Sequence, residues 1–145
     1  MTPGTLFFDT RFVFHDGEEG QKIIVVLGSG QGVTIGVKST SQGRRYRNDY
    51  GCQADHRFPN FHLPRGSCCL SKPTWVCLDE YYEFRDSELL QRHFSGEINR
   101  IGVLTDPVTI ELLECALATE DINGRQAAIV QTALDAFRGG SNEEL

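Results

Sequence analysis

The sequence predicts an α+β domain in which strands come first and helices follow. The first part of the chain contains aromatic and β-branched segments of strand length joined by short turns, and the last third changes to a helical period. The chain has 145 residues, of which 39% are hydrophobic and 23% are charged, a composition typical of a soluble globular domain. We therefore expect one domain over residues 1–145, with a small curled sheet or barrel backed by helices.

Strands are predicted from the start of the chain. Thr5 to Phe14 (TLFFDTRFVF) is rich in aromatic and β-branched residues and ends at the turn signal HDGEEG. Residues 22–27 (KIIVVL) and 33–37 (VTIGV) are further strands on either side of GSGQG. That turn lacks the Lys-Ser/Thr of a phosphate loop, and no helical pattern follows it, so it predicts a hairpin without a nucleotide. The three strands indicate an antiparallel meander.

The middle of the chain is polar and basic. From Gln42 to about Asn60 it contains Gly and Pro at intervals, which predicts a long exposed loop, a feature that is often functional in small domains. Phe61 to Leu63 and Trp75 to Phe84 (WVCLDEYYEF) return to strand composition. The sheet or barrel is therefore expected over about residues 4–84.

The C-terminal part has helical patterns. Asp86 to Phe94 has an acidic start, and Thr105 to Leu117 opens with a capping residue and an early proline. Its apolar stripe consists of Val108, Leu112, Cys115 and Ala116. Another helix is predicted over Arg125 to Phe137. The helical part therefore covers about residues 86–138, and residues 139–145 are expected to form a frayed tail.

The charge is unevenly distributed along the chain. The formal net charge is −6, yet residues 21–75 carry eight cations against two anions, which gives +6 locally and leaves −12 for the rest. The eight cations are Lys22, Lys38, Arg44, Arg45, Arg47, Arg57, Arg65 and Lys72. Because exposed charges are screened beyond about 8 Å at physiological ionic strength, a ligand near this region senses the local excess. A polyanion is therefore an expected partner.

The cysteines and the apolar runs bear on the compartment. The five cysteines are odd in number and follow no disulfide-scaffold spacing, which predicts reduced thiols, with Cys77 and Cys115 in the core. No segment resembles a signal peptide, and no apolar run is long enough to cross a membrane. We expect a cytoplasmic location without a membrane partner.

A zinc hypothesis arises from five residues of the middle region. They are Cys52, His56, His62, Cys68 and Cys69. Their spacing matches no standard zinc knuckle, and loop histidines with half-buried thiols are the alternative that we favour. No metal or other cofactor is therefore expected.

Five short segments follow one another in a characteristic order. They are Gly4–Asp9 (GTLFFD), Gly20–Leu27 (GQKIIVVL), Val37–Gln42 (VKSTSQ), Leu70–Asp79 (LSKPTWVCLD) and Ile101–Thr105 (IGVLT). Together they resemble the MazF/PemK family of toxin ribonucleases, over residues 4–41 and 62–118. The resemblance implies an SH3-like barrel followed by C-terminal helices.

The resemblance also implies a function. The family members are metal-independent endoribonucleases of type II toxin–antitoxin systems, which cut single-stranded RNA as homodimers and are neutralised by an acidic, partly disordered antitoxin. Thr40 would contact the phosphate, Lys22 would stand where the family has an arginine, and Asp79 would serve acid–base work or fix the geometry. A second family arginine is replaced by Cys77. These departures leave three alternatives: the cleavage chemistry is altered, it uses a cation at another position, or it is lost. Lys22, Thr40 and Asp79 also each have a purely structural interpretation.

The segment KSTSQGRRYRNDY supplies further candidates. Arg44, Arg45 and Arg47 would bind phosphates, Arg44 and Arg45 with the bidentate fork that a lysine lacks, and Tyr46 or Tyr50 would stack on unpaired bases. The alternative is a solubilising loop. His15 is a candidate proton carrier because its ordinary pKa is about 6.5, with a plain surface role as the alternative.

Two other functions fit the same patterns. One is a catalytically inactive RNA-binding or protein-interaction module on the same barrel. The other is an interaction protein whose aromatic strands, residues 5–14 and 75–84, form a dimer interface.

Overall fold

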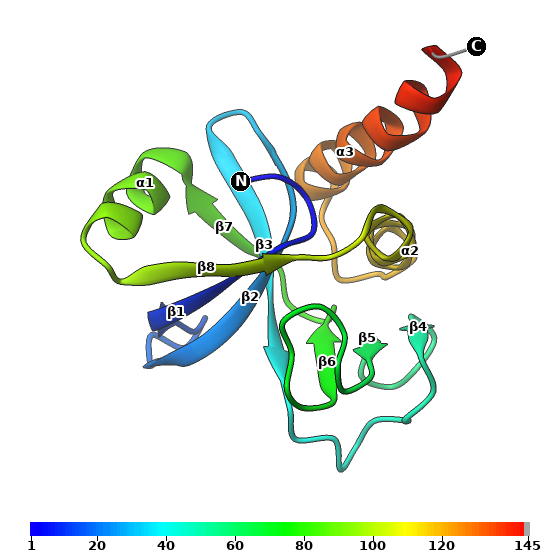
Figure 1. Cartoon of the computed structure of the whole chain (residues 1–145), viewed down its shortest axis with the longest axis horizontal. Helices are drawn as coiled ribbons and strands as arrows, with labels where there is room; N and C mark the ends of the chain where they lie inside the picture. Colours follow the sequence, from blue (N-terminus) through cyan, green and yellow to red (C-terminus); the bar gives the residue numbers. More distant parts are fainter. Residues whose placement is uncertain (144–145) are drawn as a thin grey trace.

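The computed structural model describes the backbone of residues 1–143 and the side chains of residues 1–139. An antiparallel sheet of eight strands is combined with three helices (Figure 1). The strands are β1 Thr5–Val13, β2 Glu19–Gly30, β3 Val33–Thr40, β4 Gly51–Gln53, β5 Asn60–Leu63, β6 Thr74–Cys77, β7 Tyr82–Arg85 and β8 Ile98–Val103. The helices are α1 Asp86–Phe94, α2 Asp106–Leu117 and α3 Gly124–Glu143. The predicted α+β class with C-terminal helices is confirmed.

The first three strands form the predicted meander. β1 pairs with β2, with Phe7 opposite Ile24, and β2 pairs with β3, with Val25 opposite Val37. The turn between β2 and β3 consists of Gln31 and Gly32, whose φ angles are +56° and +79°. Two consecutive left-handed residues define a type I′ turn, which matches the twist of a hairpin and suits glycine. The predicted hairpin turn is therefore confirmed.

β3 lies at the centre of the sheet. The strand order is β4-β5-β6-β3-β2-β1-β8, and β7 also pairs with β3. β7 lies along residues 33–36 of β3, whereas β6 pairs with Ser39 and Thr40 and with β5. The segment predicted as a strand over residues 75–84 is therefore extended only in part: it forms two strands, β6 and β7, which pair with different parts of β3.

The sheet is wider than expected and is not closed. β8 pairs with β1 inside the range that was predicted to be helical, and β4 interrupts the predicted loop. Among the described residues, no ladder joins the outer strands β4 and β8. α3 continues to Glu143, into the segment expected to fray, and residues 144 and 145 lie outside the described residues.

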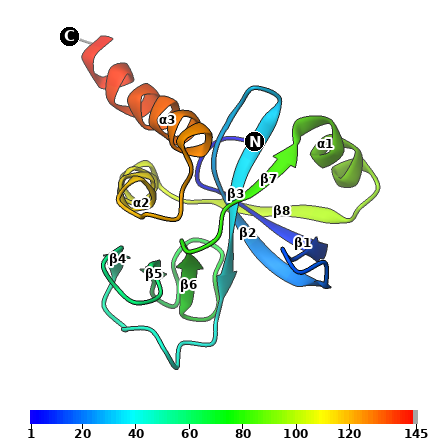
Figure 2. The ribbon, with the colours of Figure 1, turned by 180° about the vertical axis from the view of Figure 1, so that it is seen from behind.

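Two hydrophobic clusters hold the helices on the sheet. The larger cluster packs α2 and α3 against β2 and β3, and the smaller one packs α1 beside β1. Members of the larger cluster include Val25, Leu27, Val37, Leu112, Leu113, Val130 and Leu134; the smaller cluster includes Phe7, Phe12, Ile24, Leu89 and Ile98. The helices therefore occupy separate sides of the sheet, with α1 apart from the α2–α3 pair (Figure 2).

Within residues 1–143, no helix has both the length and the apolar composition needed to cross a bilayer.

Cys52 and Cys115 form a disulfide that connects β4 to α2, with a Cα–Cα distance of 5.5 Å. The prediction of five reduced thiols is therefore wrong for this pair, while Cys77 is buried as expected. The two cysteines are 63 residues apart in the sequence, and the packing of α2 on β4 brings them together. Local spacing carries no information about such a pairing.

Candidate functional site

A cavity of about 430 Å³ lies where β2 and β3 meet the segment that follows β3. It is lined by Phe14, Lys22, Lys38, Thr40, Gln42, Arg44, Arg45, Tyr46 and Cys77, and we call it the basic cavity. Five residues that the sequence indicated as site residues are therefore gathered at one place: Lys22, Thr40, Arg44, Arg45 and Tyr46. Arg47 and Asp79 are not part of its lining.

Strand geometry brings the β2 and β3 residues of the basic cavity together. Lys38 and Thr40 are two residues apart on β3, so their side chains project from the same face. Ile24 stands opposite Lys38, and continuing this register puts Lys22 opposite Thr40. Nζ of Lys22 donates a hydrogen bond to the Ser39 carbonyl at 3.4 Å, which keeps the ammonium at the end of β3.

The cavity is strongly cationic. Lys22, Lys38, Arg44 and Arg45 all line it, and none of its described lining residues is acidic. Of these four cations, Lys38 alone has a carboxylate partner among the described residues, with Nζ 3.2 Å from Oε2 of Glu80. Cations gathered in a hollow raise the local concentration of anions. The arrangement therefore favours a negatively charged ligand.

Glu80 is the acidic neighbour of the basic cavity, and sequence reasoning missed it. Its Oε2 accepts a hydrogen bond from the Tyr82 hydroxyl at 2.7 Å. This bond, together with Lys38, holds the pKa of Glu80 below its ordinary value. The ring of His15 stacks on Tyr82 at 4.1 Å, so the candidate proton carrier lies beside this network and outside the cavity lining.

Tyr46 forms part of the cavity wall. Its ring stacks on Trp75 with a centroid distance of 5.9 Å, and its hydroxyl lies 3.8 Å from Sγ of Cys77. Burial, then Cys77 and more weakly Asp79, raise the pKa of Tyr46 to about 12. The phenol is therefore neutral at physiological pH, and Trp75 already covers one face of the ring that was expected to stack on a base. Asp79 lies outside the lining of the cavity, and its negative charge contributes to the raised pKa of Tyr46.

Arg47 anchors the basic segment instead of lining the cavity. Its carbonyl accepts hydrogen bonds from Nε1 of Trp75 at 2.9 Å and from Nε2 of Gln53 at 3.2 Å. Its guanidinium lies 3.7 Å from Oδ1 of Asp55. The predicted loop is thus anchored to the sheet, although most of its residues up to Tyr50 are exposed as expected. Tyr50 is anchored in the same way, because its hydroxyl donates to Glu111 at 2.6 Å.

The remaining basic side chains lie at the cavity rim. The guanidinium carbon of Arg45 lies 4.5 Å from the centre of the Phe58 ring, which holds this cation by a cation–π contact. Arg44 is exposed, and no described carboxylate forms an ion pair with it. Oγ1 of Thr40 accepts a hydrogen bond from the Gln42 amide at 3.2 Å, so the hydroxyl proton of Thr40 remains available for a ligand.

The five residues of the zinc hypothesis do not come together. Cys52 is in the disulfide, and His62 is buried with Nδ1 3.1 Å from the Thr74 carbonyl. Among the side chains of residues 1–139, no group of three or more His, Cys, Asp or Glu is arranged to hold a metal ion. The zinc hypothesis is therefore wrong for the full set of residues.

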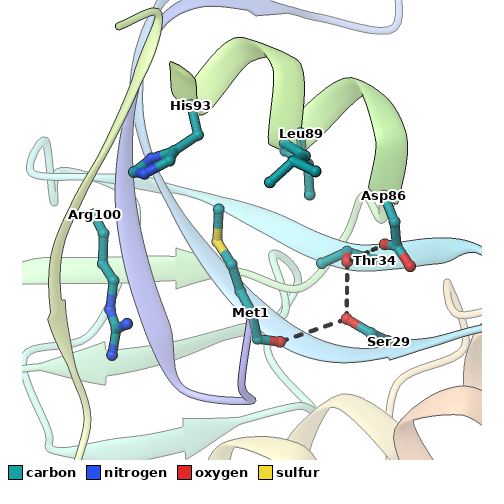
Figure 3. A pocket seen from close by; sticks show the side chains of 8 residues that line it. Met1, Ser29, Thr34, Asp86, Leu89, His93 and Arg100 are labelled. Atoms are coloured by element: carbon teal, nitrogen blue, oxygen red, sulfur yellow. Dashed lines mark hydrogen bonds between the residues drawn. The ribbon is translucent and has the colours of Figure 1, made fainter. Parts of the chain in front are cut away.

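A second cavity, of about 420 Å³, lies beside α1 (Figure 3). Oγ1 of Thr34 donates to Oδ1 of Asp86 at 2.7 Å and lies 2.8 Å from Oγ of Ser29. Ser29, Thr34 and Asp86 therefore satisfy one another, whereas the lining residues His93 and Arg100 form no ion pair with a described carboxylate. None of the predicted site residues lines it.

Comparison with the models of known protein families gives no match for this chain. No curated protein has a significantly similar sequence. The functional assignment therefore depends on the basic cavity.

Proposed function

We propose that the basic cavity binds the phosphodiester backbone of single-stranded RNA. The observation that carries this proposal is the convergence of Lys22, Lys38, Arg44 and Arg45 on a cavity with no acidic residue among its described lining. Phosphate contacts supply much of the affinity of proteins for nucleic acids. Arg44 and Arg45 offer the bidentate donor geometry that suits a phosphate, and Thr40 adds a hydroxyl donor.

Two features favour an unpaired RNA strand over other polyanions. Phe14 and Tyr46 add aromatic surface to the cavity, and unpaired bases pack on such surface. The resemblance to the MazF/PemK family implies the same ligand. A chain of negative net charge that carries a cationic cavity would also attract RNA to that cavity.

The salt dependence of RNA binding tests this proposal. Each phosphate contact with a single strand contributes about 0.7 to the slope of log K against log salt. The double variant Arg44→Gln/Arg45→Gln should therefore reduce the magnitude of this slope by about 1.4 for a single-stranded RNA oligomer. Arg47→Gln is the matched control and should leave the slope unchanged, since Arg47 is paired with Asp55. Equal slopes for wild type and double variant would refute the proposal.

RNA cleavage is a second candidate function, favoured by the presence of Lys22 and Thr40 in the same cavity. Metal-independent cleavage needs a base for the 2′-hydroxyl, cations for the charge that builds on phosphorus, and an acid for the leaving oxygen. We propose that Lys22 and the two rim arginines stabilise that charge, that Thr40 binds a phosphate oxygen, and that Asp79 serves the acid–base step. The protein would then be an endoribonuclease toxin of a type II toxin–antitoxin system on an SH3-like barrel.

An RNA cleavage assay in the presence of a metal chelator tests this second function. Lys22→Ala and Thr40→Ala should each reduce the rate about 100-fold or more, because each removes a donor to the developing charge. Lys72→Ala is the matched control, as this lysine is exposed and lies outside the cavity lining. Binding without cleavage would favour the inactive RNA-binding or interaction module. Cleavage that ignores both changes would place the reaction elsewhere.

The partners follow from the same proposal. A toxin of this kind would act in the cytoplasm, form a homodimer and bind an acidic antitoxin segment, which the cationic cavity would attract. Sedimentation analysis would show the dimer, and an acidic peptide should displace RNA from the cavity. Expression of the chain alone should arrest growth, and Thr40→Ala should relieve the arrest.

A further inference from the structure

Cys68 and Cys69 are neighbours in the loop between β5 and β6, and both are exposed and free. The loop lies against β8, an outer strand of the sheet, because Sγ of Cys68 donates to the Val103 carbonyl at 3.4 Å. A free thiol pair is thus held at a defined place on the molecule. Neither thiol belongs to the basic cavity.

The two sulfur atoms converge on one point beside Gly102. A Cβ atom added to Gly102 would lie 2.7 Å from Sγ of Cys68 and 2.9 Å from Sγ of Cys69. The sulfurs are therefore separated by no more than the sum of these distances. A zinc–thiolate bond is about 2.3 Å long, so an ion held between two sulfurs requires a separation of up to about 4.6 Å. The convergence is compatible with that geometry.

The backbone supports the convergence. Cys68 has a φ angle of +51°, which is uncommon for a residue with a side chain. Strained positions of this kind persist where the surroundings hold them and gather at ligand sites.

From this geometry we propose that Cys68 and Cys69 bind a thiophilic metal ion of low coordination number, with Cu(I) as the probe. Thiolate ligands select soft ions such as Cu(I). Binding forms two metal–sulfur bonds and releases one proton from each thiol, with no change in oxidation state. Because no third metal-binding side chain joins the pair within the described residues, the site suits two-coordinate ions better than four-coordinate Zn²⁺.

Anaerobic titration of the full-length chain with Cu(I), in competition with a chromogenic chelator, tests the proposal. Wild type should take up one equivalent, and Cys68→Ser/Cys69→Ser should lose it. Gly102→Ala should weaken binding about tenfold or more, because the added methyl group would lie too close to both sulfurs and displace them. A thermal unfolding curve recorded for each variant separates loss of the site from loss of the fold.

Cys52→Ser/Cys115→Ser is the matched control, because reduction of the disulfide would create another thiol pair. This variant should retain the single equivalent of Cu(I) with the wild-type affinity. The proposal is overturned if wild type binds no Cu(I), if binding survives in Cys68→Ser/Cys69→Ser, or if the control variant loses it.

Discussion

Nζ of Lys38 lies 3.2 Å from Oε2 of Glu80, so one cation of the basic cavity is partly neutralised from outside its lining. Glu80→Gln removes this negative charge and keeps a hydrogen-bond acceptor for Tyr82. We expect the affinity for single-stranded RNA to rise about two- to fivefold, the scale of a partly exposed ion pair. Equilibrium binding at fixed salt measures the change.

Glu83→Gln is the matched control for this experiment, because Glu83 pairs with Arg125 and does not line the cavity. Its RNA affinity should equal that of wild type. A weaker affinity of Glu80→Gln would show that the carboxylate holds Lys38 in a productive position.

The buried carboxylate of Asp9 should be important for stability. Asp9 is 0% exposed, forms an ion pair with the Arg92 guanidinium and accepts a hydrogen bond from the Arg11 amide at 2.9 Å. Asp9→Asn leaves Arg92 without this buried charge partner, and we expect it to lower the free energy of unfolding by about 3 kcal/mol. Urea unfolding measures the loss. Glu19→Gln removes an exposed partner of Arg11 and should cost less than about 1 kcal/mol; equal losses for the two variants would contradict the argument.

Removal of the disulfide should destabilise the oxidised protein. The bond closes a chain segment with a sequence separation of 63, and its loss through Cys52→Ser/Cys115→Ser should cost about 2 to 4 kcal/mol. Chemical unfolding without reductant measures this cost, and Cys69→Ser serves as a control at an exposed free thiol. Because the cytosol keeps thiols reduced, thiol counting on a cytoplasmic sample should show mostly reduced Cys52 and Cys115. A double variant as stable as the oxidised wild type would show that the bond adds nothing.

The tyrosines should resist alkaline ionisation. Burial is the first cause at each position and raises the pKa values of Tyr46, Tyr50 and Tyr81 to about 12, and that of Tyr82 is raised as well. The ordinary value is about 10. A raised folded-state pKa contributes stability that is complete below about pH 10 and is lost as the pH rises towards 12.

Phenolate absorbance and circular dichroism followed together across alkaline pH test this expectation. The phenolate signal should stay low near pH 10 and rise when the fold is lost, and Tyr46→Phe should reduce its final amplitude. A phenol that ionises near pH 10 while the dichroism remains native would contradict the prediction for that residue.

Local patterns predicted most of the secondary structure. Alternation and turn chemistry indicated β1, the meander and the hairpin at Gln31 and Gly32, because these signals act over a few residues. β8 escaped prediction because most of its side chains, from Asn99 to Val103, are exposed or half-buried and show no alternation. It is a strand because it pairs with β1, which no local pattern encodes.

By itself, the sequence determined that the cations are concentrated between residues 21 and 75. It also indicated Lys22, Thr40, Arg44 and Arg45 as candidate site residues. Only the tertiary structure decided that these four share a cavity, while Arg47 turns to Asp55. It also brought Glu80 to Lys38, and Cys52 to Cys115. The physical reason is that composition and local periodicity follow from neighbours along the chain, whereas a cavity, an ion pair or a disulfide depends on strand register and helix packing between distant segments.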